Sequence, residues 1–438
     1  MSYESWGRLR LRERAGVDAA SINVIDGQKT GGFLPFGNGR SYGDSCHNDT
    51  GTLVDCRSLD GIIDFDHETG DLHCQAGVLL SDILAYAIPR GFFPPVTPGT
   101  QYVTVGGAIA NDVHGKNHHR RGVFGNWVQS FRLMRSDLGT IQCDRRQNSE
   151  FFAATIGGMG LTGLITDAVI RLVRTPGPDI RQHTLRFSSI DGYFDAFESF
   201  DRDHEYAVAW IDQSARGGDF GRGLLLGGDH TEDKGQAAAP RSHSRLSVPF
   251  TPPISLVNSM SMRVFNAMYF RKEKAGSSVR DVPWRSYFYP LDALGHWNRL
   301  YGPRGLHQHQ SVYPEMAGRQ TTIRLLECAQ AHGHASFLTV LKRFGGEKSP
   351  GLLSFPRPGF TLTLDFANRG KPTEKLLDAL DRIVMEAGGA VNPYKDGRMP
   401  ADVFAGSFPN WRHLENARDP ALMSDFWRRT AMTLEKQN

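Results

Sequence analysis

The chain has 438 residues, of which 39% are hydrophobic and 22% charged, an ordinary globular composition with room for two or three domains. Its 50 basic and 47 acidic residues give a formal net charge of +3, so the strongly basic surface typical of nucleic-acid-binding proteins is excluded. Five cysteines without a CxxC pair predict neither a disulfide framework nor a zinc site. With no signal-peptide core and no transmembrane stretch in the sequence, we expect a cytoplasmic protein, with peripheral membrane contact left open.

The first informative stretch is GFLPFGNGRSYGD, residues 32–44. Its apolar residues predict a short buried strand that ends in a tight glycine turn. Backbone N–H groups, a serine hydroxyl and an arginine side chain after such a turn suit a phosphate, although a plain hairpin turn would look the same. The candidate ligand residues are Gly37, Asn38, Gly39, Arg40, Ser41 and Tyr42.

Alternating and apolar patterns then predict strands at 52–55 and 62–65 and a return strand at 71–75. Residues 78–90 have apolar side chains at helical spacing, so we expect a helix that ends near Pro89 and Gly91. These elements form a small α+β unit whose loops carry polar groups.

The stretch 98–125, PGTQYVTVGGAIANDVHGKNHHRRGVFG, organises the chain. It holds six glycines in 28 residues, and Gly106 and Gly107 precede a run of small residues that allows close approach of a flat ligand. A dense polar cluster that includes His114, Lys116 and His118 follows. Closely spaced backbone N–H groups suit a diphosphate, so we interpret this stretch as a ligand cradle; the alternative is an ordinary surface loop.

Residues 158–163, GMGLTG, match the GxGxxG pattern of dinucleotide-binding proteins. That motif must follow a strand and open a helix. Here the residues before it predict a helix that starts near Asn148, and LITDAVIRLV after it predicts a strand. Because this order is inverted, we reject the Rossmann interpretation and expect close backbone packing near a ligand.

A boundary is predicted at 174–178, after which 206–212, 284–289 and 361–366 have strand-like patterns. Between 217 and 281 the composition is mostly polar, which predicts a long, partly mobile loop that shields a pocket entrance. Its apolar middle, 248–270, could pack on the domain, a lipid chain or a membrane surface.

The remaining chain holds several polar residues in ordered elements. GLHQHQSVYP, 305–314, alternates, so His307 and His309 should share one face of a strand and Gln308 and Gln310 the other. Lys342 lies within an apolar run. An amphipathic helix is predicted at 373–388, with NPYKD, 392–396, at the end of a following strand.

Several of these motifs together resemble a known group. GNGRSYGD, PGTQYVTVGGAIANDVHGKNHHRRGVFGN and ATIGGMGLTGLI are similar to the FAD-binding signatures of the vanillyl-alcohol oxidase superfamily. Within it, VHGKNHH, PLDALGHWNRLYGPRG, LKRFG and YKDGR resemble the decaprenylphosphoryl-β-D-ribose 2′-oxidases, flavoenzymes of cell-wall arabinose synthesis. The resemblance implies an α+β fold with a two-part FAD-binding domain, residues 1–176 and 390–438. A substrate domain on an antiparallel sheet, 177–389, would be inserted between them.

The resemblance also implies the site residues and a noncovalently bound FAD, because Arg40 stands where covalent relatives carry a histidine. The implied FAD contacts are the first loop given above, with Gly99, Thr100, Thr104, Gly106, Gly107, Ala108, His114, Gly115, Gly158, Gly160, Thr162 and Gly163. The implied substrate contacts are Trp210, Phe288, Gln308, Gln310, Lys342, Thr361, Thr363 and Lys395. Lys395 is the implied catalytic residue.

The implied reaction is oxidation of a sugar secondary hydroxyl, the 2′-hydroxyl of a polyprenyl-phospho-ribose, by hydride transfer to flavin. A partner keto-reductase would complete an epimerisation for cell-envelope glycan. Thr361 and Thr363 stand where mycobacterial members carry asparagine and cysteine, so an aldonolactone or free sugar oxidase of the same superfamily stays open. A remote alternative is a non-enzymatic metal-binding protein built on His114, His118 and His119, although Gly115 disfavours the helix that such a site needs.

Overall fold

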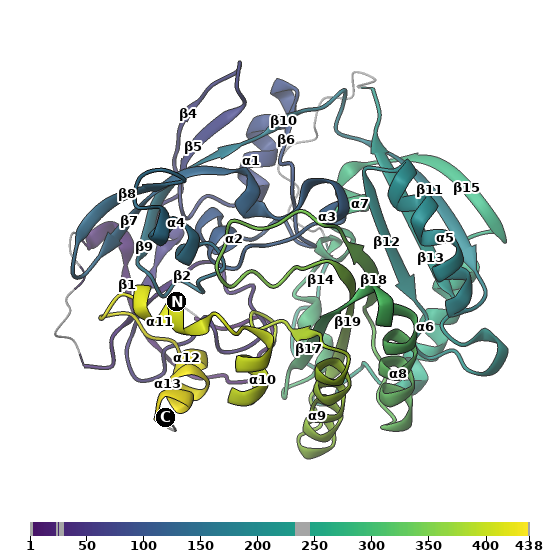
Figure 1. Cartoon of the computed structure of the whole chain (residues 1–438). Coiled ribbons are helices and arrows are strands. Elements are labelled where there is room, and N and C mark those ends of the chain that lie inside the picture. The colour runs from purple at the N-terminus through teal and green to yellow at the C-terminus, as the bar shows by residue number, and fades with distance from the viewer. Residues whose placement is uncertain (1–2, 23–24, 26–29, 233–245, 437–438) are drawn as a thin grey trace.

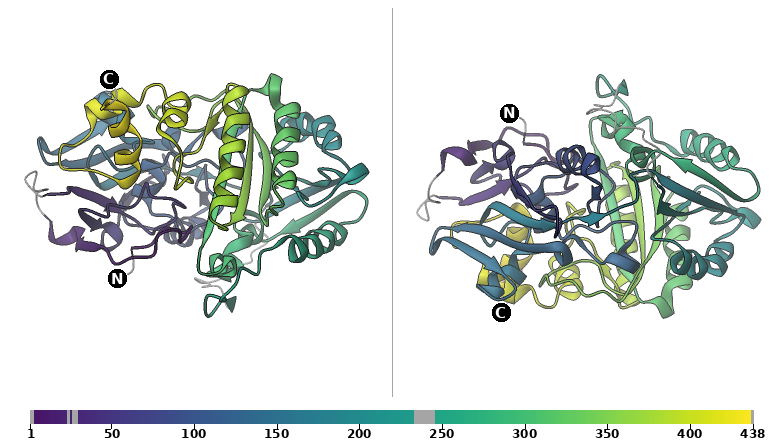
Figure 2. Two further views of the ribbon diagram at one scale, coloured as in Figure 1. Left: turned by 90° about the horizontal axis from the view of Figure 1, so that it is seen from below. Right: turned by 90° about the horizontal axis from the view of Figure 1, so that it is seen from above.

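The computed structural model describes residues 3–22, 25, 30–232 and 246–436. Figure 1 shows two groups of elements side by side, with both chain ends in the same group. The views from below and above in Figure 2 show that the yellow C-terminal helices lie with the purple and blue N-terminal elements, beside the green and teal sheet. The last part of the chain therefore returns to the first part.

The N-terminal group contains two main sheets. A parallel three-stranded sheet has the order β1-β3-β2, and an antiparallel five-stranded sheet has the order β4-β5-β9-β7-β8. The strands are β1 (Ala15–Asp18), β2 (Phe33–Phe36), β3 (Thr52–Asp55), β4 (Ile62–Phe65), β5 (Asp71–Gln75), β7 (Val128–Arg135), β8 (Gly139–Asp144) and β9 (Leu164–Arg171). A small antiparallel pair joins β6 (Phe92–Phe93) to β10 (Val173–Arg174). The strands predicted at 52–55, 62–65 and 71–75 are confirmed.

Four helices accompany these sheets: α1 (Leu80–Ala87), α2 (Val105–Ala110), α3 (His118–Arg121) and α4 (Ser149–Thr155). The predicted helix at 78–90 starts two residues later, and after Ala87 it tightens into a 3-10 turn that contains Pro89. Gly91 ends that turn with φ of 76°, a left-handed conformation that glycine adopts without strain.

The order around residues 158–163 confirms the rejection of the Rossmann motif. Helix α4 precedes the glycines and strand β9 follows them. Gly160 has φ of 73°, and a Cβ on Gly163 would lie 2.6 Å from Leu133 Cγ. These glycines therefore allow close packing of this segment.

The second group is an eight-stranded sheet in which every neighbouring pair is antiparallel, with the order β15-β11-β13-β12-β18-β19-β17-β20. Its strands are β11 (Ile180–Phe187), β12 (Tyr206–Ile211), β13 (Gly223–His230), β15 (Gly276–Val282), β17 (Leu306–Tyr313), β18 (Thr339–Phe344), β19 (Gly359–Ala367) and β20 (Ala390–Val391). Helices α5 (Ile190–Asp203), α8 (Gly318–Ala331) and α9 (Lys371–Glu386) pack on one face. Helix α3 of the N-terminal group contacts β18, and Figure 1 shows the N-terminal group beyond the opposite face.

The face under the helices is apolar. Leu341, Leu362 and Leu364 of the sheet lie in one buried cluster with Leu376 and Leu380 of α9. Helix α9 matches the amphipathic helix predicted at 373–388 to within two residues. The packed helices leave the other face of the sheet free to meet the N-terminal group.

Two expectations for this region are wrong. Residues 284–289, predicted as strand-like, form helix α7 (Trp284–Phe288) directly after Pro283, whose fixed φ suits a helix start. The aromatic pattern reflects burial rather than strand alternation, because Trp284, Tyr287 and Phe288 pack with Phe93 in one cluster.

The predicted long loop at 217–281 is also largely ordered. It contributes β13 to the interior of the sheet, β15 to its edge, and the helix α6 (Ser259–Lys272). The glycines and polar residues of this stretch indicated a loop. Gly227 and Gly228 instead lie within strand β13, where His204 and Tyr287 pack closely against them. Residues 233–245 of the predicted loop lie outside the described residues.

The remaining elements are short. A parallel pair joins β14 (Leu246–Ser247) to β16 (Leu294–Gly295). The C-terminal helices are α10 (Ala401–Ser407), α11 (Trp411–Ala417), α12 (Asp425–Arg429) and α13 (Ala431–Glu435). Single 3-10 turns occupy Ala19–Ser21, Cys56–Ser58, Ile88–Arg90, Phe124–Trp127, Gly217–Asp219, Pro290–Ala293, Trp297–Tyr301 and Glu315–Ala317. Among the described residues, no helix combines the length and apolar character needed to cross a membrane.

The C-terminal helices are fixed to the N-terminal group by buried polar contacts. Arg429 donates two hydrogen bonds to the Asp44 carboxylate, at 2.8 and 2.9 Å. The backbone of Phe33 exchanges hydrogen bonds with Ala421 and Met423, at 2.7 and 2.9 Å. Asp44 directly follows the first glycine loop, so these contacts also hold that loop in place.

We therefore predict that Arg429→Ala lowers the free energy of unfolding by about 2 kcal/mol, because it leaves the buried Asp44 carboxylate without its closest cation. Urea denaturation followed by circular dichroism measures the change. The matched control is Arg202→Ala, which breaks a largely exposed pair with Asp203 and should cost less than about 0.5 kcal/mol. Equal effects of the two substitutions would contradict the account.

Candidate active site

The free face of the eight-stranded sheet carries a row of polar side chains. Direct cross-strand partners share a face, and the register pairs Trp210 with Val340, Val340 with Thr363, and Thr363 with Gln310. Residues two positions apart along each strand lie on this same face. Its polar residues are Lys342, Thr361, Thr363, Asp365, Gln308 and Gln310.

The opposite face of β17 carries the two histidines, as the alternation predicts. His309 is buried and lies 3.1 Å from Asp381 of α9, on the helix side of the sheet. The assignment of Gln308 and Gln310 to one face and of His307 and His309 to the other is confirmed.

His114 connects this polar row to the N-terminal group. Its Nδ1 lies 2.9 Å from Lys342 Nζ, and its Nε2 lies 3.0 Å from the Gln310 amide nitrogen. Lys342 also donates to the Gly115 carbonyl at 2.7 Å. Burial holds the pKa of His114 well below its ordinary value, and the charge of Lys342 acts in the same direction. His114 is therefore neutral near pH 7 and serves as a hydrogen-bonding joint between the two groups.

Three lysines are shielded from solvent along this polar row: Lys342 is buried, and Lys116 and Lys395 are half-buried. Burial lowers the pKa of Lys342 to about 7, and the positive charges of Lys116 and Lys395 add to the shift. Burial alone lowers the pKa of Lys116 to about 7. Among the described residues no carboxylate forms an ion pair with any of the three, so this region is built to receive negative charge.

Lys395 sits at the other end of the polar row. It follows β20 and places its Nζ 4.6 Å from the centre of the Tyr42 ring, within cation–π range. Burial lowers the pKa of Lys395 to about 8, and the charge of Asp365 opposes that shift. An amine with this pKa can exchange a proton near neutral pH.

Asp365 is the acidic group of the site. Burial raises its pKa to about 7, while the hydrogen bond from Gln308, at 2.6 Å, favours the carboxylate. Its Oδ2 has no hydrogen-bond partner among the described residues. Tyr42, which is also hydrogen-bonded to Gln308, has a pKa raised by burial and stays neutral. Asp365 and Lys395 thus influence each other through their charges, without a direct ion pair, and their pKa values nearly match.

The first glycine loop lies against the start of α2. A Cβ on Gly37 would lie 2.5 Å from Thr104 Oγ1, and Asn38 donates to the Tyr102 carbonyl at 2.8 Å. Gly39 has φ of 58° and packs on the Glu4 carbonyl. The structure therefore brings the two glycine-rich stretches together, although they are about 60 residues apart in sequence.

Arg40 extends from this loop between two half-buried aromatic rings. Its guanidinium carbon lies 4.4 Å from the centre of the Trp6 ring and 5.6 Å from that of Tyr102. Its Nε has no hydrogen-bond partner among the described residues, and burial lowers its pKa. A buried guanidinium with an unused donor suits an anionic ligand.

The second glycine-rich stretch forms the start of a helix. Thr104 accepts a hydrogen bond from the Gly107 backbone at 3.1 Å and so caps α2. A Cβ on Gly106 would lie 3.1 Å from that of Ala76, whereas around Gly99 the space within 4 Å is open. Thr100 and the Gln101 backbone bind the Asp292 carboxylate, the latter at 2.9 Å.

Other predicted site residues lie deeper or further away. Thr162 is fully buried and hydrogen-bonds Thr155 at 2.8 Å. Phe288 is buried in the aromatic cluster with Phe93, where Lys116 Nζ lies 5.8 Å from its ring centre. Trp210 packs edge-on against Tyr269 of α6 at 4.7 Å.

The three histidines of the metal-binding alternative have separate partners. His118 accepts from the Gly345 backbone at 3.1 Å, His119 lies 3.2 Å from the His204 carbonyl, and His114 binds Lys342. No group of three metal-ligating side chains occurs among the described residues. The geometry gives this alternative no support.

Four residues next to the candidate site were not among the predicted site residues. Lys116, Asp365, Asp292 and Asn392 all contact site residues; Asn392 donates to the Gln310 side chain at 2.9 Å. The alternation of residues 361–365 offered a signal for Asp365, because it puts this residue on the face of Thr361 and Thr363. Lys116 was visible in the polar cluster but nothing in the pattern indicated its burial.

Comparison with known proteins gives this arrangement a context. Residues 26–144 match a family model described as an FAD binding domain. A decaprenylphosphoryl-beta-D-ribose oxidase of Mycolicibacterium smegmatis is 34% identical over 419 residues, 91% of this chain and 89% of the relative. An uncharacterized protein of Streptomyces coelicolor is 30% identical over 81% of this chain and 100% of its own length. A cytokinin dehydrogenase of Oryza sativa is 28% identical over 32% of this chain and 24% of its own length.

The residues present fit FAD. The paired glycine stretches leave room for close backbone approach, Arg40 has an unused buried donor, and among the described residues Lys116 and Lys342 form no ion pair with a carboxylate. FAD is therefore the cofactor of this chain, which is an FAD-dependent oxidoreductase. Because the similarity to the mycobacterial enzyme spans nearly the whole of both proteins, the chain belongs to the decaprenylphosphoryl-β-D-ribose oxidase family of flavoproteins.

Proposed function

We propose that the protein oxidises the 2′-hydroxyl of a polyprenyl-phospho-ribose to a ketone. The observation that carries this proposal is the cluster of buried Lys342 with half-buried Lys116 and Lys395 at the polar row of the sheet, since a phosphate-bearing substrate would supply the missing negative charge. The relative with whole-length similarity is named for a ribose of this type. A partner keto-reductase would complete the epimerisation of the sugar for cell-envelope glycan synthesis.

The domain division that we propose follows the sheets. Residues 1–176 and 390–438 would form a two-part FAD-binding domain of vanillyl-alcohol oxidase type, with 177–389 as the substrate domain. In support, β11 to β19 of the large sheet come from 180–367, and the tail helices contact the N-terminal group. Strand β20, at 390–391, belongs to the large sheet and marks the crossing point.

We assign the residues as follows. The glycine stretches around Gly37 and Gly106, with Arg40, would hold FAD, which when bound supplies a hydride acceptor. Lys342 and Lys116 would pair with the substrate phosphate. Gln308, Gln310, Thr361 and Thr363 would bind the sugar hydroxyls, and Trp210 and Phe288 would line the apolar side of the pocket.

Lys395 would receive the hydroxyl proton. Oxidation breaks the C–H bond of the alcohol carbon and the O–H bond of its hydroxyl group, so a hydride leaves the carbon and a proton leaves the oxygen. The amine form of Lys395, available because of its pKa of about 8, accepts that proton and becomes an ammonium group. Asp365 then stabilises this ammonium group, since its carboxylate charge raises the pKa of Lys395.

Lys395→Ala should slow anaerobic flavin reduction roughly 10²–10⁴-fold without loss of bound FAD, because Lys395 acts on the substrate rather than on the diphosphate. Arg40→Ala should instead lower the FAD content of the purified protein. Stopped-flow absorbance measures the first effect and the flavin-to-protein absorbance ratio the second. Lys375→Ala, at an exposed lysine of α9, is the control. Reduction of Lys395→Ala at the wild-type rate removes this residue from the mechanism.

The pH dependence of flavin reduction tests the proton acceptor. Because only the amine accepts a proton, the rate should fall about tenfold per pH unit below about 8 and level off above it. Asp365→Asn removes the charge that raises the pKa of Lys395, so the profile should move to lower pH. A rate that declines as the pH rises through 8 would show that the ammonium form is the active one.

We also propose that FAD is bound noncovalently, because Arg40 occupies the position of the attachment histidine of covalent relatives. Acid precipitation should release the yellow colour into the supernatant. Colour that stays in the pellet contradicts this expectation.

An activity screen separates the proposed substrate from a free sugar or an aldonolactone. The proposal predicts turnover of a prenyl-phospho-ribose and much slower turnover of ribose and of galactonolactone. Lys342→Gln should weaken the use of the phospho-ribose and leave that of free sugars unchanged. Preferred turnover of a free sugar or lactone by the wild type would replace the proposal.

A further inference from the structure

Exposed apolar side chains gather in one part of the chain. Thirteen large hydrophobic residues are exposed among the described residues, and eight of them lie between 246 and 268. These eight, which we name the apolar face, are Leu246, Phe250, Ile254, Leu256, Met260, Val264, Phe265 and Met268. Such a concentration of exposed apolar side chains on a protein surface marks a contact site for another protein or a membrane.

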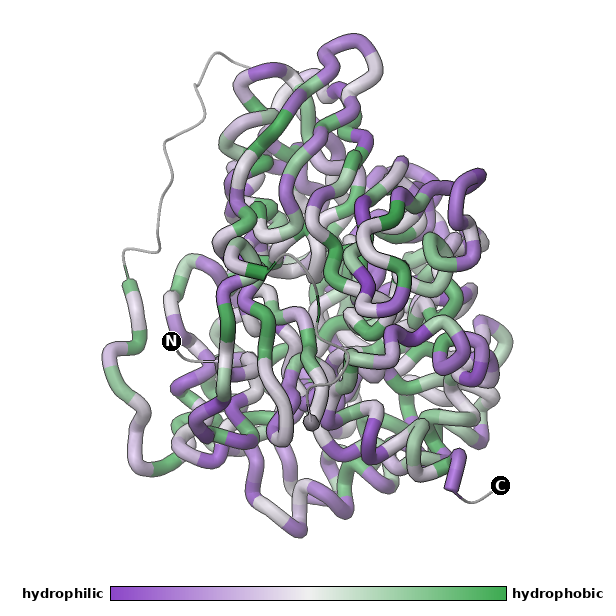
Figure 3. Tube along the Cα trace, turned by 90° about the vertical axis from the view of Figure 1, so that its left-hand side faces the viewer, coloured by the Kyte–Doolittle hydropathy of each residue, from purple (hydrophilic) through white to green (hydrophobic). Residues whose placement is uncertain are grey.

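The helix α6 presents part of this face as a continuous stripe. Met260, Val264 and Met268 repeat every four residues, so they lie one above another on the helix, and they are 78, 57 and 61% exposed. Met262 and Phe270 on the other side are buried. In Figure 3 the tube that follows the long grey trace, from residue 246 onward, stands at the edge of the molecule with several green segments.

The charged residues within the segment that carries the apolar face are all basic. The sequence from 246 to 272 contains no aspartate or glutamate, whereas Arg263, Arg271 and Lys272 of α6 are exposed. A helix with apolar residues and basic residues on its outer side is typical of proteins that lie on an anionic membrane.

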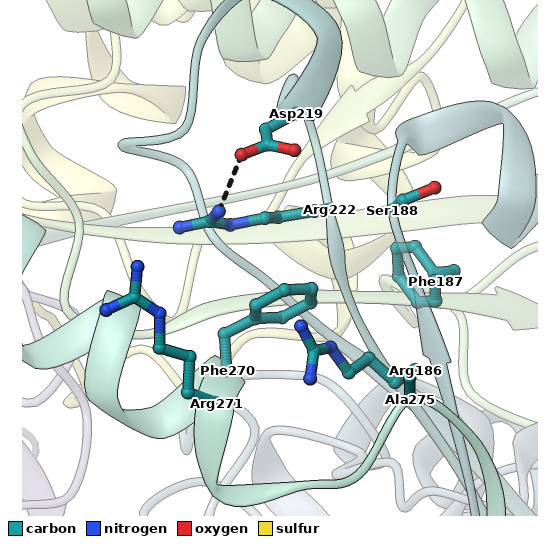
Figure 4. Close-up of a pocket in the computed structure, with 8 residues that line it drawn as sticks. All are labelled: Arg186, Phe187, Ser188, Asp219, Arg222, Phe270, Arg271 and Ala275. Atoms are coloured by element: carbon teal, nitrogen blue, oxygen red, sulfur yellow. Dashed lines mark hydrogen bonds and ion pairs between the residues drawn. The ribbon is translucent and has the colours of Figure 1, made fainter.

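A pocket of about 360 Å³ lies at the end of α6 and extends this positive charge (Figure 4). Arg186 and Arg222 contact the Phe270 ring at 4.1 and 4.6 Å, and Arg271 lies at its side. Asp219 is the acidic residue lining the pocket, and it pairs with Arg222 at 2.7 Å; Arg222 also pairs with the buried Asp212 at 2.9 Å. Among the described residues, Arg186 and Arg271 form no ion pair. The pocket therefore keeps a positive balance beside the apolar stripe, as an anionic lipid headgroup requires.

We propose that the apolar face and the adjoining arginine pocket dock the protein on an anionic lipid membrane. A second copy of the chain would bring the same exposed basic residues of α6 close to each other, so charge favours the membrane as the occupant. Apolar side chains enter the interface region, and the cations contact phosphate headgroups.

The docking surface also adjoins the proposed substrate pocket. Tyr269 of α6 packs on Trp210, and Phe265 packs on Phe337 at 5.1 Å. A lipid-linked sugar could then reach the site from the bilayer without full transfer of its polyprenyl chain into water. This last step rests on the proposed function, whereas membrane docking itself does not.

Flotation of the FAD-loaded protein with lipid vesicles tests the docking surface. Vesicles of phosphatidylcholine with roughly 30% phosphatidylglycerol should carry the wild type, and pure phosphatidylcholine vesicles should carry far less. The triple variant Met260→Asp, Val264→Asp, Met268→Asp should bind the anionic vesicles at least about fivefold less. All three positions are exposed, so the fold should survive, which circular dichroism and flavin absorbance verify.

The matched control is Ile63→Asp, Leu138→Asp, Met316→Asp, which adds the same charge at exposed apolar positions elsewhere and should bind as the wild type does. Equal vesicle binding of the two triple variants, or no binding of the wild type to anionic vesicles, overturns the proposal. If light scattering shows that the wild type is a dimer, that only the first triple variant disrupts this dimer, and that the wild type does not bind vesicles, the apolar face contacts a second copy. That result also overturns the proposal. The vesicles contain no sugar, so vesicle binding does not depend on the proposed function. Reduction of the flavin by a water-soluble short-chain prenyl-phospho-ribose should be equal in all variants. Loss of membrane docking can therefore be distinguished from failure of the proposed function.

Discussion

The shielding of three lysine side chains from solvent at one seam, with Lys342 buried and Lys116 and Lys395 half-buried, is the constraint on which the site depends. Removing an ammonium group from water is unfavourable, and proteins relieve the cost by neutralising the group or by supplying an opposite charge. Here the pKa values of Lys116 and Lys342 fall to about 7 and that of Lys395 to about 8. In the proposed function, ligands that bring negative charge would complete this seam and offset that cost.

The two sheet systems are arranged so that this seam exists. Helices α5, α8 and α9 cover one face of the eight-stranded sheet, so its polar face must meet the N-terminal group. His114 and Gly115 reach across to Lys342, while the C-terminal return places Lys395 beside Tyr42. The candidate cofactor-binding segments and the candidate substrate residues of the sheet therefore come from opposite sides of one interface.

Much of this arrangement could be predicted from local patterns. The glycine stretches at 37–39 and 106–107, the alternation of β17 and the helix α9 each depend on residues close in sequence, so their signals are visible there. Local patterns could not predict the row from Trp210 to Gln310, because it depends on the order β12-β18-β19-β17, which pairs strands far apart in the chain; only the family resemblance grouped these residues. The burial of Lys116 and the helical state of 284–288 likewise follow from tertiary packing.

The central claim is that the lysines with lowered pKa values bind an anionic ligand and become protonated when it binds. Proton uptake on ligand binding tests this claim most directly. Calorimetric titration of the FAD-loaded protein with a short-chain prenyl-phospho-ribose at pH 8, in buffers of different ionisation enthalpy, counts the protons taken up. At pH 8 Lys342, with its pKa of about 7, is mostly neutral, and a bound phosphate would raise that pKa. Lys116, with a pKa that is also about 7, would respond in the same way, so the account predicts uptake of up to about two protons per site, reduced by about one in Lys342→Gln. Binding without proton uptake in the wild-type protein would contradict it.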